Sequence, residues 1–514
     1  MGKKSLLLFV IFLSAVLFAC QNSETTTTTI ATTSSTFATS DTTAITTEAV
    51  TTDLSTTPTT TAEQTMSERV NSLANEYKIG LFITEEPTTS IGINFAMPSD
   101  TYGYVEYSIA GENNFTRYRA ISKARAIGSK YAYLFEVTLS NLTPGETYDY
   151  RVTNTDDSEA SPYYQFTMPS NDSDAFTFIY LADPQENSEI GYMAYAYSLL
   201  SVMEYSEQTY DFVMFPGDLV DDADLKTEWA LFYKYSSIFS YNTPIVATVG
   251  NHDVGAISDE RIQELEFDGY LNLPNNGPEY NSFNMLEGDL RSTNFDDGKT
   301  YSFDYGYAHF IVIDTEIYCD GTTACLAYDT ANADILNDWI ADDLRNNALP
   351  WTIVLLHRGP YSLSYNTSSV RDNLVPIFDE YGVDLVLSGH DHQYSRAVYS
   401  EDTLLEFATS NTYTKGDIFL SDTTLDDYDF NQYDRAIGVT YLTGNTASTK
   451  FYGGDKASGL SVNYKFIDEQ PVIPYITVTE NSISVVSYVV LKDTAFAIIP
   501  NGVDILEEFS IIKD

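Results

Sequence analysis

Apolar runs that end in polar residues constrain the fold of this chain more than any other feature of its sequence. The runs show no polar alternation, which is typical of strands buried on both faces, and they read FTFIYLA, DFVMFP, PIVATV, HFIVID, WTIVLL and DLVLS. Residues 333–344 place apolar side chains at helical spacing on one face. Strands that alternate with such helices predict an α/β fold for residues 172–514, with a central sheet covered on both faces.

Polar residues with ligand chemistry follow five of these runs. The segments are Asp183-Pro184-Gln185, Gly217-Asp218, Gly250-Asn251-His252-Asp253, His357 and Gly389-His390-Asp391-His392. The carboxyl ends of parallel strands meet at one edge of a sheet, so these side chains should converge in one crevice. The chain holds 5 histidines, and all but His309 fall in these segments. A single H-x-H pair would be weak support, but the ordered set predicts a metal site.

Residues 67–169 show a different pattern. Short runs between residues 79 and 168 alternate apolar and polar positions and are rich in aromatic and β-branched residues; they read IGLFI, SIGINFAM, YGYVEYSI, YAYLFEVTL, TYDYRVT and YYQFTM. Turn signals such as Pro144-Gly145 separate them. This part of the chain is expected to be an all-β antiparallel sandwich.

The first 66 residues carry signals for export. Two lysines precede an apolar run that is too short to span a membrane and that ends at Cys20, which is typical of a secretory signal over residues 1–20. The segment LFAC resembles a bacterial lipoprotein cleavage site, so Cys20 is expected to carry lipid; ordinary secretion is the alternative. The threonine-rich residues 21–66 predict a disordered tether, so the membrane is contacted only through the lipid.

Charge and cysteine content limit the functions that this chain can have. The 26 basic and 74 acidic residues give a net charge of −48, which argues against a nucleic-acid-binding surface. Of the 3 cysteines, Cys319 and Cys325 remain for a small disulfide in an oxidising compartment. A redox or metal role for this pair would call for C-x-x-C spacing or further soft ligands, which the pair lacks.

The motifs together resemble a known family. DPQ, GD, GNHD, His357 and GHDH stand in the order found in calcineurin-like metallophosphoesterases, and the segments YSFDYGYAHFIVIDTE and GHDHQYSR are similar to its purple acid phosphatase-like branch. TEEPTTSIGINF and LTPGETYDYRV resemble the fibronectin type III-like domain that precedes the catalytic domain in that branch. The resemblance implies a four-layer β-sandwich flanked by helices, preceded by an all-β sandwich.

The resemblance also implies roles for the residues of the motifs. Two divalent ions (Mn, Zn, Fe or Mg) would be bridged by Asp218; one ion would be completed by Asp183, Gln185 and His392, and the other by Asn251, His357 and His390. His252 would face the leaving group, while Asp253 would orient its ring and raise its pKa. Arg358, Tyr361, Tyr394 and Arg396 flank the ligand segments, where they would either contact substrate or support the structure.

This chain departs from the family pattern at two positions. Purple members carry a tyrosine three residues after the Asp of GD, whereas this chain has Asp221, so no iron–tyrosinate bond and no colour are expected. Gln185 stands where many members have histidine, and its neutral amide should favour Mn²⁺ or Mg²⁺ and weaken that site. His309, within HFIVID, is expected to be a structural histidine with satisfied hydrogen bonds.

These observations favour an exported hydrolase that cleaves phosphate monoesters by metal-activated hydroxide. A phosphodiesterase acting on nucleotides or lipid head groups is the alternative, because the same two-metal chemistry serves both ester classes. A second alternative is a surface binding or adhesion protein whose metal site is vestigial. In the first two cases the partner is a small phosphorylated substrate, and the motifs predict no oligomeric state.

Overall fold

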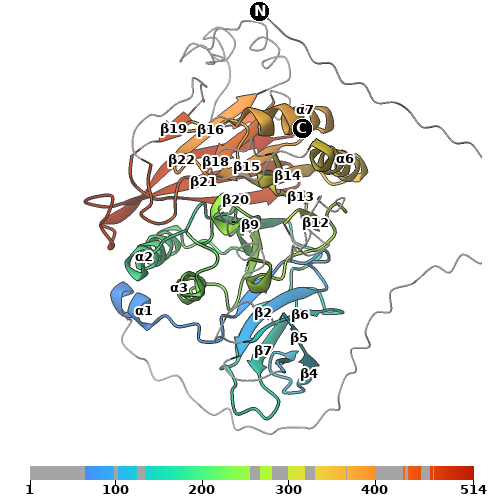
Figure 1. Cartoon of the computed structure of the whole chain (residues 1–514), viewed down its shortest axis with the longest axis vertical. Coiled ribbons are helices and arrows are strands. Elements are labelled where there is room, and N and C mark those ends of the chain that lie inside the picture. Colours follow the sequence, from blue (N-terminus) through green and yellow to red (C-terminus); the bar gives the residue numbers. More distant parts are fainter. Residues whose placement is uncertain are drawn as a thin grey trace, which may run out of the picture. The chain divides into compact units, whose positions relative to one another are not determined.

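A computed structural model describes most of the chain after residue 63 (Figure 1). The described residues are 64–97, 102–123, 133–254, 267–279, 299–318, 330–365, 367–399, 432–434, 438–452, 464–466 and 468–513. All of them belong to one compact unit, Ala44–Asp514. The predicted lipid site Cys20 and the predicted disulfide Cys319–Cys325 lie outside the described residues. Within those residues, the helices are all too short or too polar to cross a membrane.

The predicted α/β strands fall into two sheets. The larger sheet contains the parallel strands β9 (Ala175–Tyr180), β10 (Phe212–Phe215) and β11 (Pro244–Ala247), extended beyond β9 by β20 (Val472–Thr479), β21 (Ser482–Leu491), β22 (Gly502–Ile512) and β17 (Gln432–Asp434). The second sheet has the order β12 (Tyr301–Tyr305), β13 (Ala308–Ile313), β14 (Trp351–Arg358), β15 (Leu385–Gly389), β18 (Val439–Thr443), β16 (Tyr394–Tyr399) and β19 (Tyr464–Phe466).

The expectation of one central sheet is therefore wrong, and the reason is physical. Phe178 and Phe212 of the larger sheet share a buried core with Phe310 and Leu355 of the second sheet, so each sheet packs one face against the other. The opposite face of each sheet is covered by helices. A strand in either sheet is apolar on both faces, which produces the same sequence pattern as a single sheet between two helical layers.

Helices form the two outer layers. The core shared with the larger sheet includes side chains of α2 (Glu189–Ser206) and α3 (Lys226–Ser236), while α6 (Thr330–Asn346) and α7 (Ser368–Tyr381) share a core with the second sheet. The order helix, sheet, sheet, helix confirms the predicted four-layer fold. The short helix α1 (Met66–Ser72) packs on α2, where the Ser67 and Tyr197 hydroxyls lie 3.2 Å apart.

The amino-terminal strands form the predicted sandwich. One layer has the order β1 (Gly80–Phe82), β2 (Ile91–Met97), β6 (Tyr133–Leu139) and β5 (Ile121–Ser122); the other has the order β4 (Thr116–Arg119), β3 (Tyr104–Ile109), β7 (Thr147–Thr153) and β8 (Tyr164–Thr167). Aromatic and aliphatic side chains fill the space between the layers, among them Phe95, Phe135 and Phe166. The all-β module expected from the alternating pattern is thus confirmed.

The sandwich continues the larger sheet without a break. Strand β1 pairs in parallel with β11, with Leu81 opposite Pro244 and Phe82 opposite Ile245. Beside this junction the rings of Tyr164 and Tyr241 stack with centroids 4.1 Å apart, and the Tyr150 hydroxyl donates to the Tyr241 carbonyl at 2.8 Å. The module is therefore joined to the α/β part by backbone hydrogen bonds as well as by side-chain packing.

Candidate metal centre

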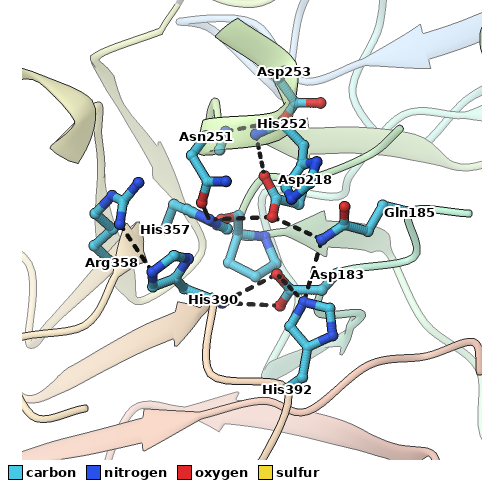
Figure 2. Close-up of polar contacts among 12 residues, drawn as sticks. Asp183, Gln185, Asp218, Asn251, His252, Asp253, His357, Arg358, His390 and His392 are labelled. Carbon is cyan, nitrogen blue, oxygen red and sulfur yellow. Dashed lines mark hydrogen bonds and ion pairs between the residues drawn. The ribbon is translucent and has the colours of Figure 1, made fainter. Parts of the chain in front are cut away.

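The loops that follow strands of both sheets converge on one buried cluster (Figure 2). Asp183, Asp218 and His392 form one group of possible ligands, and Asp218, His357 and His390 form another. Within each group the donor atoms lie within 4.8 Å of one another, and Asp218 belongs to both. The residues come from the ends of β9, β10, β14 and β15, as the strand-end pattern predicted.

The backbone at these ligands adopts an uncommon conformation. Asp183, Asp218, His390 and His392 have φ of 42°, 51°, 69° and 51°, which lies in the left-handed region that non-glycine residues seldom occupy. Such a residue costs on the order of 1–3 kcal/mol and persists where the surrounding structure holds it. Each chain segment thus turns sharply where it leaves the sheet and brings its side chain into the cluster.

Two glycines allow the loops to approach the carboxylates. A Cβ atom on Gly250 would lie 2.2 Å from Asp218 Oδ1, and one on Gly389 would lie 2.3 Å from Asp183 Oδ2. A backbone N–H soon after each glycine reaches a carboxylate: that of His252, two residues after Gly250, donates to Asp218 at 2.8 Å, and that of His390, directly after Gly389, donates to Asp183 at 3.0 Å. The glycines therefore permit the hydrogen bonds that orient both carboxylates.

The imidazoles present their second nitrogen to the centre. His357 Nδ1 lies 2.9 Å from the Pro216 carbonyl, and His392 Nδ1 contacts the Lys450 carbonyl, so each ring carries its proton on Nδ1 and directs the Nε2 lone pair inward. Burial lowers the pKa of His357 and His390 and lowers that of His392 to about 4. All three rings are neutral at pH 7, which is the form that binds metal.

The donor set fits divalent cations. His357 Nε2 and Asn251 Oδ1 are both acceptors and face each other at 3.1 Å, an arrangement that a cation between them would satisfy. Burial, and next the charge of Asp218, raises the pKa of Asp183 well above its usual range. Two neighbouring buried carboxylates ionise together only when positive charge is added, and carboxylate, imidazole and amide oxygen are ligands for such ions.

Comparison with known proteins agrees with this geometry. Residues 176–394 match the family described as calcineurin-like phosphoesterase, and residues 77–168 match the purple acid phosphatase N-terminal domain. Residues 176–394 are thus similar to a calcineurin-like phosphoesterase domain. This range contains the strands β9, β10, β11, β14 and β15 and the loops with the possible metal ligands described above.

Curated relatives point to the same class. The chain is 25% identical to an acid phosphatase of Aspergillus ficuum over 231 residues, which are 33% of this chain and 36% of the relative. It is 30% identical to human acid phosphatase type 7 over 146 residues, 25% of this chain and 32% of the relative. Purple acid phosphatase 22 of Arabidopsis thaliana is 25% identical over 290 residues, 53% of this chain and 57% of the relative. These matches support a phosphoric ester hydrolase, although they span about a third of the first two relatives.

A solved structure shares the fold. The purple acid phosphatase PPD1 from yellow lupin seeds superposes with a TM-score of 0.59 at 16% identity, covering 85% of this chain and 74% of that chain. At this identity the likeness concerns the fold alone. It agrees with the four-layer phosphoesterase domain preceded by a β-sandwich.

His252 lies at the edge of the phosphoesterase centre, and its partner differs from the one expected. Its Nδ1 lies 2.7 Å from the Asp221 carbonyl and 3.3 Å from the Asp221 carboxylate. The expectation that Asp253 orients this ring is wrong, because the Asp253 carboxylate accepts from the backbone N–H groups of Leu219 and Gly250 at 3.1 and 2.9 Å. Consecutive residues of the short helix α4 (Asn251–Val254) point in different directions, so Asp253 ties two ligand loops together.

Gln185 reaches the centre together with a residue that the sequence motifs did not indicate. The amide nitrogen of Gln185 lies 2.8 Å from Asp218 Oδ2 and 3.2 Å from His392 Nε2, while its oxygen accepts from Lys450 Nζ at 3.0 Å. Lys450 also forms an ion pair with Asp221. It lies in the loop after β18, whose apolar run VTYLT is followed by Gly444-Asn445, so the strand-end pattern could have indicated this loop as well.

One of the four residues proposed to contact substrate lies at the centre. Arg358 Nη1 lies 2.9 Å from His390 Nε2, while its Nε donates to Glu316 at 2.7 Å. The rings of Tyr365 and Tyr452, which the motifs did not indicate, lie against His390 and His392 with centroids 4.3 and 4.1 Å apart.

The other three residues lie in the interior, and their contacts favour the structural role that the sequence had left open for them. The Tyr394 hydroxyl and the Arg396 guanidinium both bind the buried carboxylate of Glu507, at 2.8 and 2.6 Å. Tyr361 packs edge-on against Tyr441 within the core beneath α7. Strand residues such as these point into the layers between sheets and helices, and proximity in sequence to GHDH does not bring them to the loop edge.

Proposed function

We propose that this protein is an exported dinuclear metallohydrolase that cleaves phosphate monoesters. The observation that carries the proposal is the sharing of Asp218 between two buried groups of possible ligands. The signal-like residues 1–20 support export, with Cys20 as the lipid-bearing residue. The partner is a small phosphorylated molecule.

The residues of this chain divide between holding the metals and handling the leaving group. Asp218 would bridge two divalent ions, with Asp183, Gln185 and His392 on one and Asn251, His357 and His390 on the other. When bound, such ions supply an activated water for attack on phosphorus and positive charge for the phosphoryl oxygens. The neutral state of the three buried histidines supports this arrangement, because protonated rings would compete with metal.

His252 would protonate the leaving-group oxygen. Its side chain is 29% exposed at the edge of the cluster, and the Asp221 carbonyl holds Nδ1, which leaves Nε2 to face a bound ester. The Asp221 carboxylate lies 3.3 Å from the same Nδ1, so both polar groups of Asp221 hold the ring in this orientation.

The test is metal removal and restoration on the purified full chain. Phosphate release from p-nitrophenyl phosphate should vanish when metal is stripped and return with Mn²⁺, Zn²⁺, Fe²⁺ or Mg²⁺. Asp218→Asn should lose both activity and tight metal binding, while Asp222→Asn, a partly exposed carboxylate in the same loop, should retain them. Metal binding without hydrolysis of any ester in the parent would instead favour a surface binding protein.

The class of ester is tested with matched substrates. Hydrolysis of p-nitrophenyl phosphate at a higher kcat/KM than bis(p-nitrophenyl) phosphate supports the monoesterase. The reverse order would replace that proposal with a phosphodiesterase, because both compounds release the same chromophore and differ only in the second ester bond.

A further inference from the structure

Lys450 places a positive charge inside the candidate metal centre. Its ammonium lies 3.0 Å from the Gln185 amide oxygen and pairs with the Asp221 carboxylate, and its side chain is 26% exposed. The backbone carbonyl of the same residue accepts from His392 Nδ1. One residue thus contacts both Gln185 and His392, two of the side chains assigned by resemblance to the same metal.

The partners of the Gln185 amide decide which end faces the metal position. An amide can turn by 180° with almost no change in shape, so its orientation follows from what its two ends bind. An ammonium has donors only and requires the amide oxygen. The amide nitrogen then faces two acceptors, Asp218 Oδ2 at 2.8 Å and His392 Nε2 at 3.2 Å. The opposite orientation would bring donor against donor at Lys450 and acceptor against acceptor at Asp218.

We propose that Lys450 is a resident cation of the metal centre that keeps the Gln185 oxygen away from the metal, so that Asp183, Asp218 and His392 alone supply the protein ligands of that subsite. The inference rests on the proposed two-metal function and revises its ligand set. Gln185 becomes a positioning residue: its amide N–H orients the Asp218 carboxylate, which belongs to both groups of possible ligands.

The same lysine performs two different tasks through its two ends. Its carbonyl fixes the proton of His392 on Nδ1 and so directs the Nε2 lone pair to the metal position. Its ammonium donates a hydrogen bond to the Gln185 amide oxygen and adds a positive charge beside the metal position. A fixed cation close to a bound cation lowers the affinity for the latter, so this subsite should be the weaker of the two.

The test measures metal binding to the full chain by titration calorimetry and by metal content after dialysis against Mn²⁺ or Zn²⁺. Gln185→Ala should retain two metals, with the weaker affinity within about threefold of the parent, because no ligand is lost. Lys450→Met should raise the weaker affinity by about tenfold or more, because a neighbouring positive charge is removed. Lys450→Arg, which restores a donor-only cation, should return the affinity toward the parent value.

His392→Ala provides the reference for losing a true ligand and should bind one metal fewer. If Gln185→Ala also loses one metal while the parent binds two, Gln185 is a ligand: the inference is overturned and the two-metal proposal stands. Unchanged metal affinity in Lys450→Met overturns it as well. If the parent binds no metal, the two-metal function fails and this inference fails with it. Circular dichroism and thermal unfolding establish that each variant is folded before its affinity is compared.

Discussion

Asp218 shows how closely the residues of the candidate centre depend on one another. Its carboxylate accepts from the His252 backbone and from the Gln185 amide, and it belongs to both groups of possible ligands. The glycine at 250 leaves the space that this carboxylate needs. A methyl group at position 250 has no room beside this carboxylate, so small changes at neighbouring positions should alter metal binding before they alter the fold.

Gly250→Ala should displace Asp218 and abolish tight metal binding. The new methyl group would lie 2.2 Å from Asp218 Oδ1 and 2.4 Å from its backbone nitrogen, and relief of this overlap should cost about 1–3 kcal/mol of unfolding free energy. Metal content after dialysis and urea unfolding measure the two effects. Gly502→Ala is the matched control, because a Cβ there meets no atom within 4 Å. A Gly250→Ala protein that keeps parent metal affinity would show that the loops can relax.

His252→Ala should slow hydrolysis by a factor that depends on how much the leaving group needs a proton. For an alkyl phosphate, whose alcohol needs a proton, kcat should fall by about 10²- to 10⁴-fold. For p-nitrophenyl phosphate the fall in kcat should be much smaller, because nitrophenolate is a good leaving group that departs without being protonated. His309→Gln serves as a control for the loss of a histidine outside the centre. Equal losses on both substrates would assign His252 a role other than proton donation.

Much of the centre was predictable because each ligand follows a recognisable strand. Asp183, Asp218, His357 and His390 stand directly after apolar runs, and topology alone brings such positions together. The partners of His252 and Gln185 were not predictable. They depend on side-chain directions within single turns and on Lys450, which lies 265 residues beyond Gln185.

At the scale of elements, the division of the strands into two sheets decides which residues reach the centre. Alternation distinguished sandwich strands such as β6 and β7 from α/β strands, because these strands bury one face more deeply than the other. Strand β2 is the exception, since all of its residues are buried. Alternation did not separate β9, β10 and β11 from β13, β14 and β15, since both sets are buried on both faces. The number of sheets therefore had to come from the resemblance or from the structure.

His309 connects three elements and makes their association depend on pH. Its ring lies between Asp304 of β12 at 2.7 Å and Asp343 of α6 at 2.8 Å, which confirms the structural role predicted for it. Burial lowers its pKa, but the two carboxylates outweigh this effect and raise the pKa from 6.5 to about 9. The protonated ring thus stabilises the fold fully below about pH 6.5, and this contribution is lost as the pH rises through about 9.

The expected pH dependence follows from this shift. Urea unfolding of the parent should show a loss of at most about 3 kcal/mol between these pH values, reduced because Asp304 is 67% exposed. His309→Gln should remove that part of the pH dependence. Asp343→Asn should remove more of it than Asp304→Asn, since Asp343 is the more buried partner. An identical pH dependence in the parent and in His309→Gln would contradict the assignment.

At the scale of the whole molecule, the two family-matched segments contribute strands to one shared sheet. The parallel pairing of β1 with β11 and the stacking of Tyr164 on Tyr241 tie the sandwich to the α/β part of the chain. The sequence predicted both parts and the change of pattern between them. It did not predict that the two parts share a sheet, because the three residues of β1 contain no pattern that specifies their partner strand.

Calorimetry should therefore show one cooperative unfolding transition for the described unit, with equal calorimetric and van't Hoff enthalpies. Tyr241→Ala removes the stacked ring and should lower the unfolding free energy by about 1–3 kcal/mol without splitting the transition. Two separate transitions in the parent would mean that the sandwich unfolds independently and that the shared strands add little cooperativity.

The β1–β11 pairing also determines where this chain can be shortened. A fragment that begins at residue 172 would keep the strands that carry the ligands but would leave the outer edge of β11 bare. Unpaired N–H and C=O groups on such an edge are a template for adding strands from other molecules. The amino-terminal module covers this edge of the larger sheet, so its removal should reduce solubility even where the candidate metal centre stays intact.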